Sequence, residues 1–325
     1  MKKNKAFSLV ELSVVILIIG ILVAGVTQSG RLIRQIKLST ARSITASSDV
    51  ASIRDVTAWF EASTDGIFVD INGVTDVENN AQIATWNDIN PQKPKGDRPV
   101  LRAPNLTADT TKKPKYITNG INGIPSVYFD GTDDYVFSTD SPTMPLISGD
   151  KTYSMFAVFR ADLDSAKRKA IITQIGDNVA LVDNKFVSIG FFGDATNKGL
   201  PGFITDNTEK KNNWVRDTAI NDQTDYIVGV LADLTATTIS QDSAKIYVNS
   251  LTALASSAFP AGGNYSSTTI EAKKLTIGAN AKATADVDDF FKGMVSEVIY
   301  FDRKLKDEEA QSVMKYLRKK YNILN

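Results

Sequence analysis

The sequence predicts a mainly β protein that starts with one long α-helix and ends with a second, shorter helix. A run of apolar residues from 6 to 26 continues without proline to about residue 52, which is typical of a single long helix. From residue 55 onward, short strand-like runs alternate with Gly, Asn, Asp and Pro, as in all-β domains. Helical spacing returns only at residues 306–321, so we expect the final helix to pack on a sandwich of strands.

Two residue types are missing, because the 325-residue chain holds no histidine and no cysteine. Their absence excludes a Ser-His-Asp triad, a thiolate nucleophile, a disulfide and any zinc site built from these side chains. Charge is unevenly distributed: residues 1–54 hold eight Lys or Arg against two Asp or Glu, whereas the remainder holds 29 against 35. The acidic remainder argues against nucleic acid as a partner.

The N-terminal run, AFSLVELSVVILIIGILVAGV, has 21 residues and one charge, that of Glu11. As a helix it would span about 30 Å, the thickness of a bilayer core. A short basic leader, MKKNKA, precedes it. A secretory signal peptide would instead place its small-residue cleavage site after the apolar run. We therefore expect a helix over residues 7–54 whose first half lies in the membrane and whose second half lies against the body.

Basic and apolar residues occupy different faces of the second half of this helix. The apolar stripe begins at Leu32, Ile33 and Ile36 and extends to Ile53. The basic residues are Arg31, Arg34, Lys37 and Arg42. We interpret them as a solvated face rather than a dedicated lipid-headgroup site.

The segment Lys5-Ala6-Phe7-Ser8-Leu9-Val10-Glu11 resembles the type III signal of type IV prepilins and pseudopilins. The resemblance implies that a membrane-embedded prepilin peptidase and methyltransferase removes the leader, residues 1–6, by cutting between Ala6 and Phe7, and then methylates the new amine. It also implies that Glu11 helps to recruit each subunit into a filament, and that the N-terminus is cytoplasmic before cleavage. A lone carboxylate in an apolar run is otherwise costly, which favours a functional role.

The segment departs from the family pattern at two points. Ala6 stands where the family usually has Gly, and no Pro interrupts the apolar run, so Gly20 or Gly25 is the expected place for a helix break. The alternative interpretation is a simple signal anchor in which Glu11 has no special role.

The body is predicted to be a two-sheet sandwich. One strand, Tyr153–Ala161, contains the run Tyr153–Phe159, which is apolar on both faces, as expected for a strand with a covered outer face. The final helix places Ala310, Val313, Met314, Leu317 and Tyr321 on one stripe. The other candidate strands are Pro125–Phe129, Tyr135–Ser138, Ala170–Ile175, Phe186–Phe192, Tyr226–Ala232, Lys245–Asn249, Lys274–Ile277 and Gly293–Phe301.

Several stretches of the body resemble bacterial laminin-G-like, concanavalin A-like domains. The stretches are Ala58–Ser63, Ala84–Asp88, Asn119–Pro125, Phe129–Tyr135 and Phe291–Leu305, in that order along the chain. The resemblance implies a jelly-roll β-sandwich over residues 55–325, after the leader and the helix of residues 7–54. This fold hosts lectins, glycosidases and protein-binding modules, so it does not by itself assign a function.

The body offers no convincing catalytic pair. The Glu-x-Asp-x-x-Glu string of related glucanases is absent, and we interpret Glu297, in the last strand, as structural. We therefore predict that the protein is not an enzyme and needs no cofactor.

The acidic clusters and the aromatic residues are the remaining candidates for binding. Asp130, Asp133 and Asp134 form one cluster, and Asp286, Asp288 and Asp289 form another; because neither has calcium-loop spacing, turn capping is favoured over a metal site. Trp59 and Trp86 are expected in the core. Trp214, together with Tyr265, is the candidate ligand platform.

These observations leave two hypotheses of different classes. In the first, the chain is a pilin-like subunit of a type IV pilus or a type II secretion pseudopilus, and the large body favours a minor subunit. Its partners are then the peptidase, other pilin subunits and the inner membrane, with extracellular glycan or protein as a candidate ligand. The expected location is a single-pass inner-membrane protein that later joins a periplasmic or cell-surface filament. In the alternative, it is a membrane-anchored lectin-like adhesin that does not polymerise.

Overall fold

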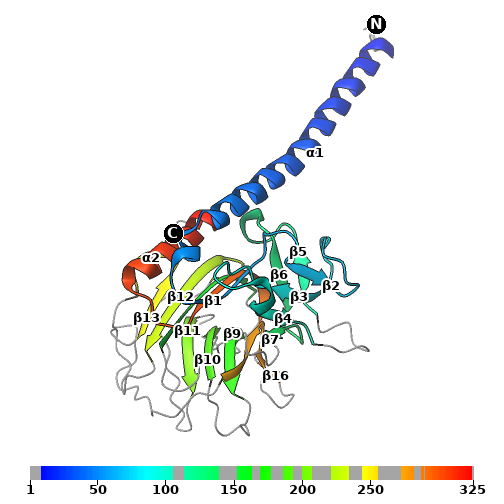
Figure 1. Cartoon of the computed structure of the whole chain (residues 1–325). Coiled ribbons are helices and arrows are strands. Elements are labelled where there is room, and N and C mark those ends of the chain that lie inside the picture. Colours follow the sequence, from blue (N-terminus) through cyan, green and yellow to red (C-terminus); the bar gives the residue numbers. More distant parts are fainter. Residues whose placement is uncertain are drawn as a thin grey trace.

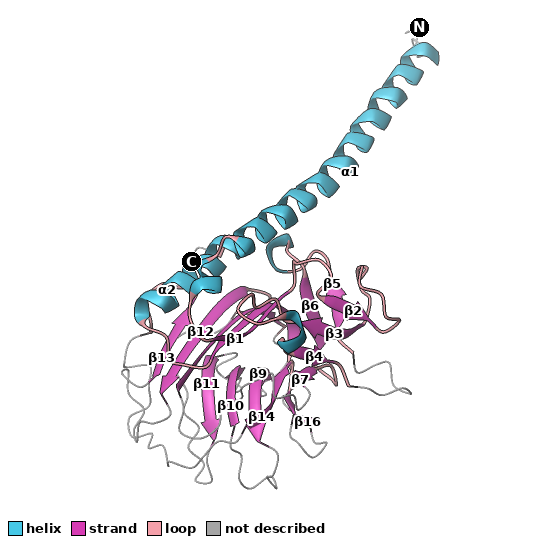
Figure 2. Ribbon diagram, in the orientation of Figure 1, coloured by secondary structure: helices cyan, strands magenta, loops and turns pink. Residues whose placement is uncertain are grey.

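The structure is a computed structural model that describes residues 9–104, 113–138, 152–162, 169–176, 186–192, 200–206, 221–233, 244–254, 272–281, 287–288 and 290–323. A long N-terminal helix projects away from a body made of two β-sheets, and the C-terminus lies beside the point where this helix meets the body (Figure 1). The prediction of a mainly β sandwich flanked by one long and one shorter helix is confirmed (Figure 2).

The N-terminal helix α1 runs from Leu9 to Ala46 and is followed by the short 3₁₀ helix η1, Asp49–Ser52. It continues through Gly20 and Gly25, so the expected break at these glycines is wrong. It also ends earlier than residue 54. At its end Ser47 Oγ donates a hydrogen bond to the carbonyl of Ser43 at 2.8 Å, and such serine-to-backbone bonds compete with the helical pattern.

The first sheet has the strand order β13-β12-β8-β17-β6-β5, with β1 also paired to β17. Its strands are β1 (Val56–Glu61), β5 (Lys115–Ile117), β6 (Ser126–Asp130), β8 (Thr152–Ala161), β12 (Asp225–Asp233), β13 (Ala244–Val248) and β17 (Lys292–Phe301).

The second sheet has the order β11-β10-β9-β14-β7-β4-β3-β2. Its strands are β2 (Phe68–Asp70), β3 (Ile83–Asn87), β4 (Val100–Arg102), β7 (Val136–Ser138), β9 (Lys169–Gly176), β10 (Phe186–Phe192), β11 (Leu200–Asp206) and β14 (Ala272–Ile277). Two further strands, β15 (Asn280–Ala281) and β16 (Val287–Asp288), pair with each other, and the remaining short 3₁₀ helices are η2 (Lys95–Asp97) and η3 (Ile121–Gly123).

The first sheet is buried on both faces. Met155, Ala157 and Phe159 of β8 face the second sheet, whereas the alternate residues Phe156 and Val158 belong to a separate core beneath the helices. This alternation explains the doubly apolar run in β8. The outer cover is made by α2, η1 and the end of α1, together with loop residues such as Leu305 and Leu251, which gives three layers (Figure 2).

The C-terminal helix α2, Asp307–Tyr321, packs on the first sheet as predicted. All five residues of its expected apolar stripe are buried. Two interactions hold its start: Arg303 forms a bidentate pair with Glu309 at 2.7 Å for both bonds, and the backbone N–H of Lys306 donates to Glu309 Oε2 at 2.9 Å. Asn322 ends the helix in the left-handed conformation, which asparagine tolerates well.

Every strand predicted from the sequence is present in the structure. The strands that were not anticipated, β1 to β5, β11, β15 and β16, are mostly short or lie next to Pro, Gly and Asn. Such strands lack a long alternating pattern, and their pairing partners define them.

Candidate assembly segment and its anchorage on the body

The first half of α1 exposes an apolar surface. The large apolar side chains between Leu9 and Val23 are 48–84% exposed. Within the described part of the chain, α1 is the one helix long and apolar enough to cross a membrane. An apolar surface of this extent marks a segment that lies in lipid or packs against other proteins.

Glu11 lies in the first turn of α1 and is the single charge between residues 9 and 30. Its side chain is exposed on the outside of the helix. The positive end of the helix dipole favours a carboxylate at this position. Ala6 and Phe7, the predicted cleavage and methylation positions, lie outside the described residues.

The second half of α1 contacts the body less extensively than we expected. Leu32, Ile33 and Ile36 are 55–57% exposed, so the prediction is wrong for the first part of the stripe. It is confirmed further on, because Val50 and Ile53 are buried against the body. Lys37 Nζ donates a hydrogen bond to the carbonyl of Asn122 at 3.2 Å. The helix leaves the body at an angle, so only its last turns can reach the sheet (Figure 1).

The last turns of α1 are fixed to the body from two sides. Arg42 Nε donates to the carbonyl of Ser63 at 2.6 Å, and the Arg42 guanidinium forms an ion pair with Asp65, just beyond β1. On the other side, Thr45 Oγ1 lies 3.1 Å from the hydroxyl of Tyr316 in α2. Thr45 is 7% exposed, so this contact lies in the interior, between the stem and the C-terminal helix.

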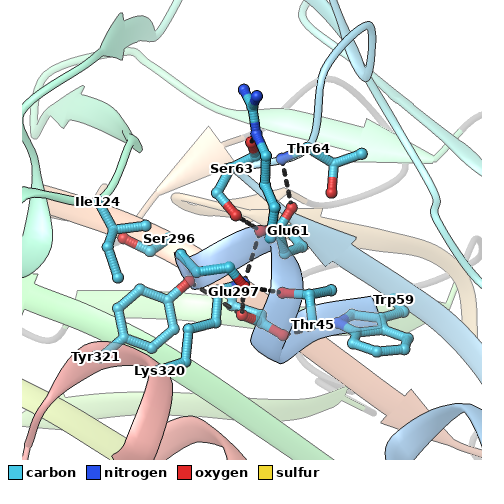
Figure 3. Close-up of polar contacts among 12 residues, drawn as sticks. Thr45, Trp59, Glu61, Ser63, Thr64, Ile124, Ser296, Glu297, Lys320 and Tyr321 are labelled. Carbon is cyan, nitrogen blue, oxygen red and sulfur yellow. Dashed lines mark hydrogen bonds and ion pairs between the residues drawn. The ribbon is translucent and has the colours of Figure 1, made fainter. Parts of the chain in front are cut away.

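Beneath this junction lie three charged side chains with no exposed surface: Glu61 of β1, Glu297 of β17 and Lys320 of α2. We call them the buried charge cluster (Figure 3). Lys320 Nζ lies 2.6 Å from Glu61 Oε1 and 2.7 Å from Glu297 Oε2. One ammonium therefore binds two carboxylates from neighbouring strands.

Glu297 accepts four hydrogen bonds, two at each oxygen. Trp59 Nε1 and the Tyr316 hydroxyl each donate to Oε1 at 2.7 Å. Lys320 Nζ donates to Oε2 at 2.7 Å, and the Tyr321 hydroxyl does so at 3.0 Å. The carboxylate is thus supplied with the donors that a buried charge requires.

The pKa values of the two carboxylates shift in opposite directions, although both groups bind the same ammonium. Burial raises the pKa of Glu297, and the nearby charge of Glu61 adds to this effect while Lys320 opposes it. Burial also acts against ionisation of Glu61, but the charge of Lys320 and hydrogen bonds from Lys320, Ser63 and Thr64 outweigh it and lower the pKa of Glu61. Burial and the charge of Glu297 raise the pKa of Tyr316 and Tyr321 well above 10, so both phenols keep the protons that they donate.

The sequence contains a signal for this cluster, although the sequence-based expectations above did not include it. Lys320 follows Ala310, Val313 and Leu317 at helical spacing, so it lies on the buried face of α2. A lysine in that position requires a buried anion. Glu297 has the structural role predicted from the sequence, and the cluster lines no cleft between its carboxylates, as a glycosidase would require.

The other candidate residues have mixed outcomes. Trp59 and Trp86 are 2% and 0% exposed, which confirms that they belong to the core. Trp214 and Tyr265, the candidate ligand platform, lie outside the described residues, as do Asp286 and Asp289. The turn of Asp130 is confirmed, because its Oδ1 accepts the backbone N–H of Thr132 at 2.7 Å.

The first half of α1, with its exposed apolar surface and the carboxylate of Glu11, is the part of the chain that matches a known family model. Residues 1–27 match the prokaryotic N-terminal methylation motif. The match covers the leader and the first half of α1, and it leaves out the body. The chain thus carries an N-terminal methylation motif ahead of a β-sandwich. The curated proteins contain no significant match to the chain.

Three solved structures illustrate the distant likeness of this chain to known folds. A Trypanosoma rangeli sialidase in complex with sialic acid is 10% identical with a TM-score of 0.49; the match covers 82% of this chain and 33% of the sialidase. Domain 4 of AbnA, a GH43 extracellular arabinanase from Geobacillus stearothermophilus, is 13% identical with a TM-score of 0.47; the match covers 80% of this chain and 98% of that domain. The botulinum neurotoxin serotype G binding domain is 12% identical with a TM-score of 0.41; the match covers 78% of this chain and 51% of the binding domain. The chain thus spans about a third of the sialidase, and these values assign no activity to it.

Proposed function

We propose that this chain is a pilin-like subunit that is cut between Ala6 and Phe7, methylated at the new amine, and assembled into a filament through α1. The observation that carries the proposal is the exposed apolar first half of α1, which has Glu11 in its first turn and matches the methylation motif. The inner membrane holds the subunit before assembly, with the leader on the cytoplasmic side. The peptidase and methyltransferase that reads this motif and other pilin subunits are its partners.

Assembly follows from the physical chemistry of α1. The apolar side chains that lipid covers before assembly are covered by neighbouring helices afterwards, so the helix is never exposed to water. Cleavage creates a positive α-amino group on Phe7. The Glu11 carboxylate of one subunit can pair with this group of the next subunit where water is scarce, and such a pair selects the helix register.

The junction between stem and body supports the same role. A subunit in a filament must hold its body in a fixed position relative to its stem, otherwise neighbouring bodies collide. The contacts of Arg42 and Thr45, above the buried charge cluster, hold the last turns of α1 on the first sheet. The end of the stem is therefore a structural part of the body rather than a linker.

We assign the subunit a minor role in a type IV pilus or a type II secretion pseudopilus, in the periplasm or at the cell surface. The body, residues 55–325, is large for a subunit that is repeated many times. Its sandwich is the module that is displayed, with an extracellular glycan or protein as its ligand. A membrane-anchored lectin-like adhesin that does not polymerise is the second candidate, because an apolar helix alone is sufficient for anchoring.

Mass spectrometry of the mature N-terminus tests the proposal. The full chain is produced in cells with and without an active prepilin peptidase. We expect a methylated N-terminal Phe7 in the first case and Met1 in the second. The matched control is Ser8→Ala, which leaves the junction between Ala6 and Phe7 unchanged and so keeps cleavage. A chain that still begins at Met1 in peptidase-positive cells, or one cut after residue 26, contradicts the proposal.

A further inference from the structure

A groove of about 330 Å³ lies between the second half of α1 and the body, where the helix leaves the body at an angle (Figure 1). Arg31, Arg34 and Gln35 line it from α1, and Asn79 and Tyr116 line it from the body. We call it the stem groove. Its remaining lining residues are Leu38, Thr118, Gly123 and Pro125, so no carboxylate belongs to the lining.

The two arginines of the stem groove are exposed, and neither forms an ion pair with a residue that the structure describes. They are three positions apart on α1, so their like charges lie on the same side of the helix and repel each other. Lys37 adds a third cation at the edge of the groove, because its side chain lies beside Gly123. The sequence alone favoured a solvated face here, but the fold encloses the two arginines with the body. An anion between them would remove the repulsion.

The wall of the stem groove that belongs to the body also offers hydrogen-bond donors. Asn79 Oδ1 accepts the N–H and the hydroxyl of Thr118, each at 3.0 Å, so the amide nitrogen is what Asn79 has left to offer. Burial raises the pKa of Tyr116 to about 12, so its hydroxyl stays protonated. A second groove that shares Tyr116 is instead lined by Asp65 and Asp76. The cationic, donor-rich lining is therefore a local property of the stem groove.

The stem groove lies at the level of the lipid headgroups if the apolar half of α1 spans a membrane. The apolar run ends at Val26, and Arg31 and Arg34 follow about 7.5 and 12 Å further along the helix axis. Headgroups fill roughly 5–8 Å on each side of the hydrocarbon core. Side chains of a helix tilt toward its N-terminus, so both guanidinium groups are directed back toward this layer.

We propose that the stem groove binds the headgroup phosphate of an anionic phospholipid through Arg31 and Arg34, with Asn79 on the opposite wall. Arginine pairs with phosphate through two parallel, charge-assisted hydrogen bonds. The lipid belongs to the leaflet opposite the leader, and it bridges stem and body before assembly. The inference rests on the membrane location in the proposed function, but not on cleavage or polymerisation. It also explains why cations follow the apolar run on the translocated side, where they are usually sparse.

Native mass spectrometry of the full chain in neutral detergent, titrated with phosphatidylglycerol or phosphatidylcholine, tests the proposal. We expect the wild type to bind phosphatidylglycerol in preference to phosphatidylcholine. The double variant Arg31→Gln, Arg34→Gln should weaken phosphatidylglycerol binding at least tenfold, because it removes the charge-assisted bonds. The double variant Arg54→Gln, Arg102→Gln removes the same charge from exposed positions outside the groove and should bind like the wild type. The basic leader is the same in every chain, so it does not contribute to the difference.

Asn79→Asp tests the groove rather than the charge of the stem. It keeps the oxygen that accepts both bonds from Thr118, but it places a carboxylate opposite the arginines. Phosphatidylglycerol binding should weaken at least fivefold, and phosphatidylcholine binding should stay unchanged. Asn221→Asp adds the same charge at an exposed position outside the groove and should have no effect. If Asn79→Asp binds like this control, the stem attracts any anionic surface and the groove is not the site.

Equal binding of the two lipids by the wild type overturns the proposal, as does unchanged phosphatidylglycerol binding by the variant that lacks Arg31 and Arg34. Inorganic phosphate provides the remaining comparison. If it displaces phosphatidylglycerol at an equal concentration, the groove is a site for free phosphate and not for lipid. Binding is measured on the uncleaved chain, so a negative result does not contradict the cut before Phe7, and a chain that is never cleaved can still bind the lipid.

Discussion

Glu61 and Glu297 lie directly opposite each other on the paired strands β1 and β17. Like charges at opposed positions in a sheet repel each other, and here both carboxylates are also fully buried. The arrangement is stable because Lys320 reaches from α2 to both of them. The C-terminal helix therefore completes a site whose two other charges come from the sheet, directly below the end of the stem.

Replacing Lys320 with Met should strongly destabilise the protein. The substitution keeps the unbranched stem but leaves two buried carboxylates without their counter-ion, which costs about 3–5 kcal/mol of the free energy of unfolding. Denaturant unfolding of the full chain in detergent measures this loss. Lys319→Met, at the exposed neighbouring position, should stay within about 0.5 kcal/mol of the wild type. A Lys320→Met chain as stable as this control would show that the ammonium does not stabilise the cluster.

Thr45→Val should weaken the junction between the stem and α2. Valine has nearly the same shape as threonine but removes the hydroxyl that lies 3.1 Å from Tyr316. We expect a loss of about 0.5–1.5 kcal/mol, typical of one buried hydrogen bond. Limited proteolysis should also cut more readily between α1 and β1. Thr40→Val, on an exposed face of the same helix, is the control, and equal cleavage of the two variants would contradict the prediction.

Glu309 should make the protein sensitive to acid. Its hydrogen bonds to Arg303 are the main reason why its pKa is lowered to about 2, and the hydrogen bond from the N–H of Lys306 also lowers it. A carboxylate whose pKa is lowered on folding stabilises the protein above its unfolded pKa, here about 4.5. That contribution is lost as the pH falls from about 4.5 to about 2. The Tm difference between the wild type and Glu309→Gln should therefore be present at pH 6 and shrink over this range; a constant difference argues against the pair.

Asp88 should have the opposite effect of pH on stability, because its pKa is raised rather than lowered on folding. Burial raises its pKa to about 7, although its Oδ1 accepts the N–H groups of Trp59 at 3.1 Å and Asn90 at 2.5 Å. A group whose pKa rises on folding favours the folded state at low pH, and this contribution is lost as the pH rises from about 4 to about 7. Asp88→Asn keeps the acceptor and cannot ionise. Its Tm relative to the wild type should increase between pH 5 and pH 8, and a flat difference would refute this.

Glu11→Gln tests the assembly charge. Loss of a charge eases membrane insertion, and the junction at Ala6 and Phe7 is unchanged, so the variant should be inserted and cleaved normally. Filament yield should fall at least tenfold when it is the sole copy of this subunit, because the Phe7 amine lacks its partner. Ser13→Ala, which removes a hydroxyl bonded to the Val10 carbonyl in the same turn, should assemble normally. Normal filaments from Glu11→Gln would support the signal-anchor interpretation instead.

Local patterns predicted much of this fold. The run in β8 showed that both faces of its sheet are covered, and the stripe on α2 showed which face of the helix is buried. The helix breaks expected at Gly20 and Gly25 were wrong, because a glycine in a long helix weakens it without ending it. The predicted extent of contact between the stem and the body was also wrong, because an apolar stripe does not specify whether the body, lipid or a neighbouring subunit covers it.

The sequence by itself determined the apolar N-terminal helix, the β-sandwich and the position of Glu11, because hydrophobic periodicity and length act within single elements. Only the tertiary structure decided that Glu61 meets Glu297, and that Lys320 neutralises them. The contact between these three side chains depends on the register between β1 and β17, which are neighbours in the sheet but far apart in the sequence. It also depends on how α2 packs over both strands. A shift of one residue in that register would turn a carboxylate to the other face of the sheet, and no local pattern of residues specifies it.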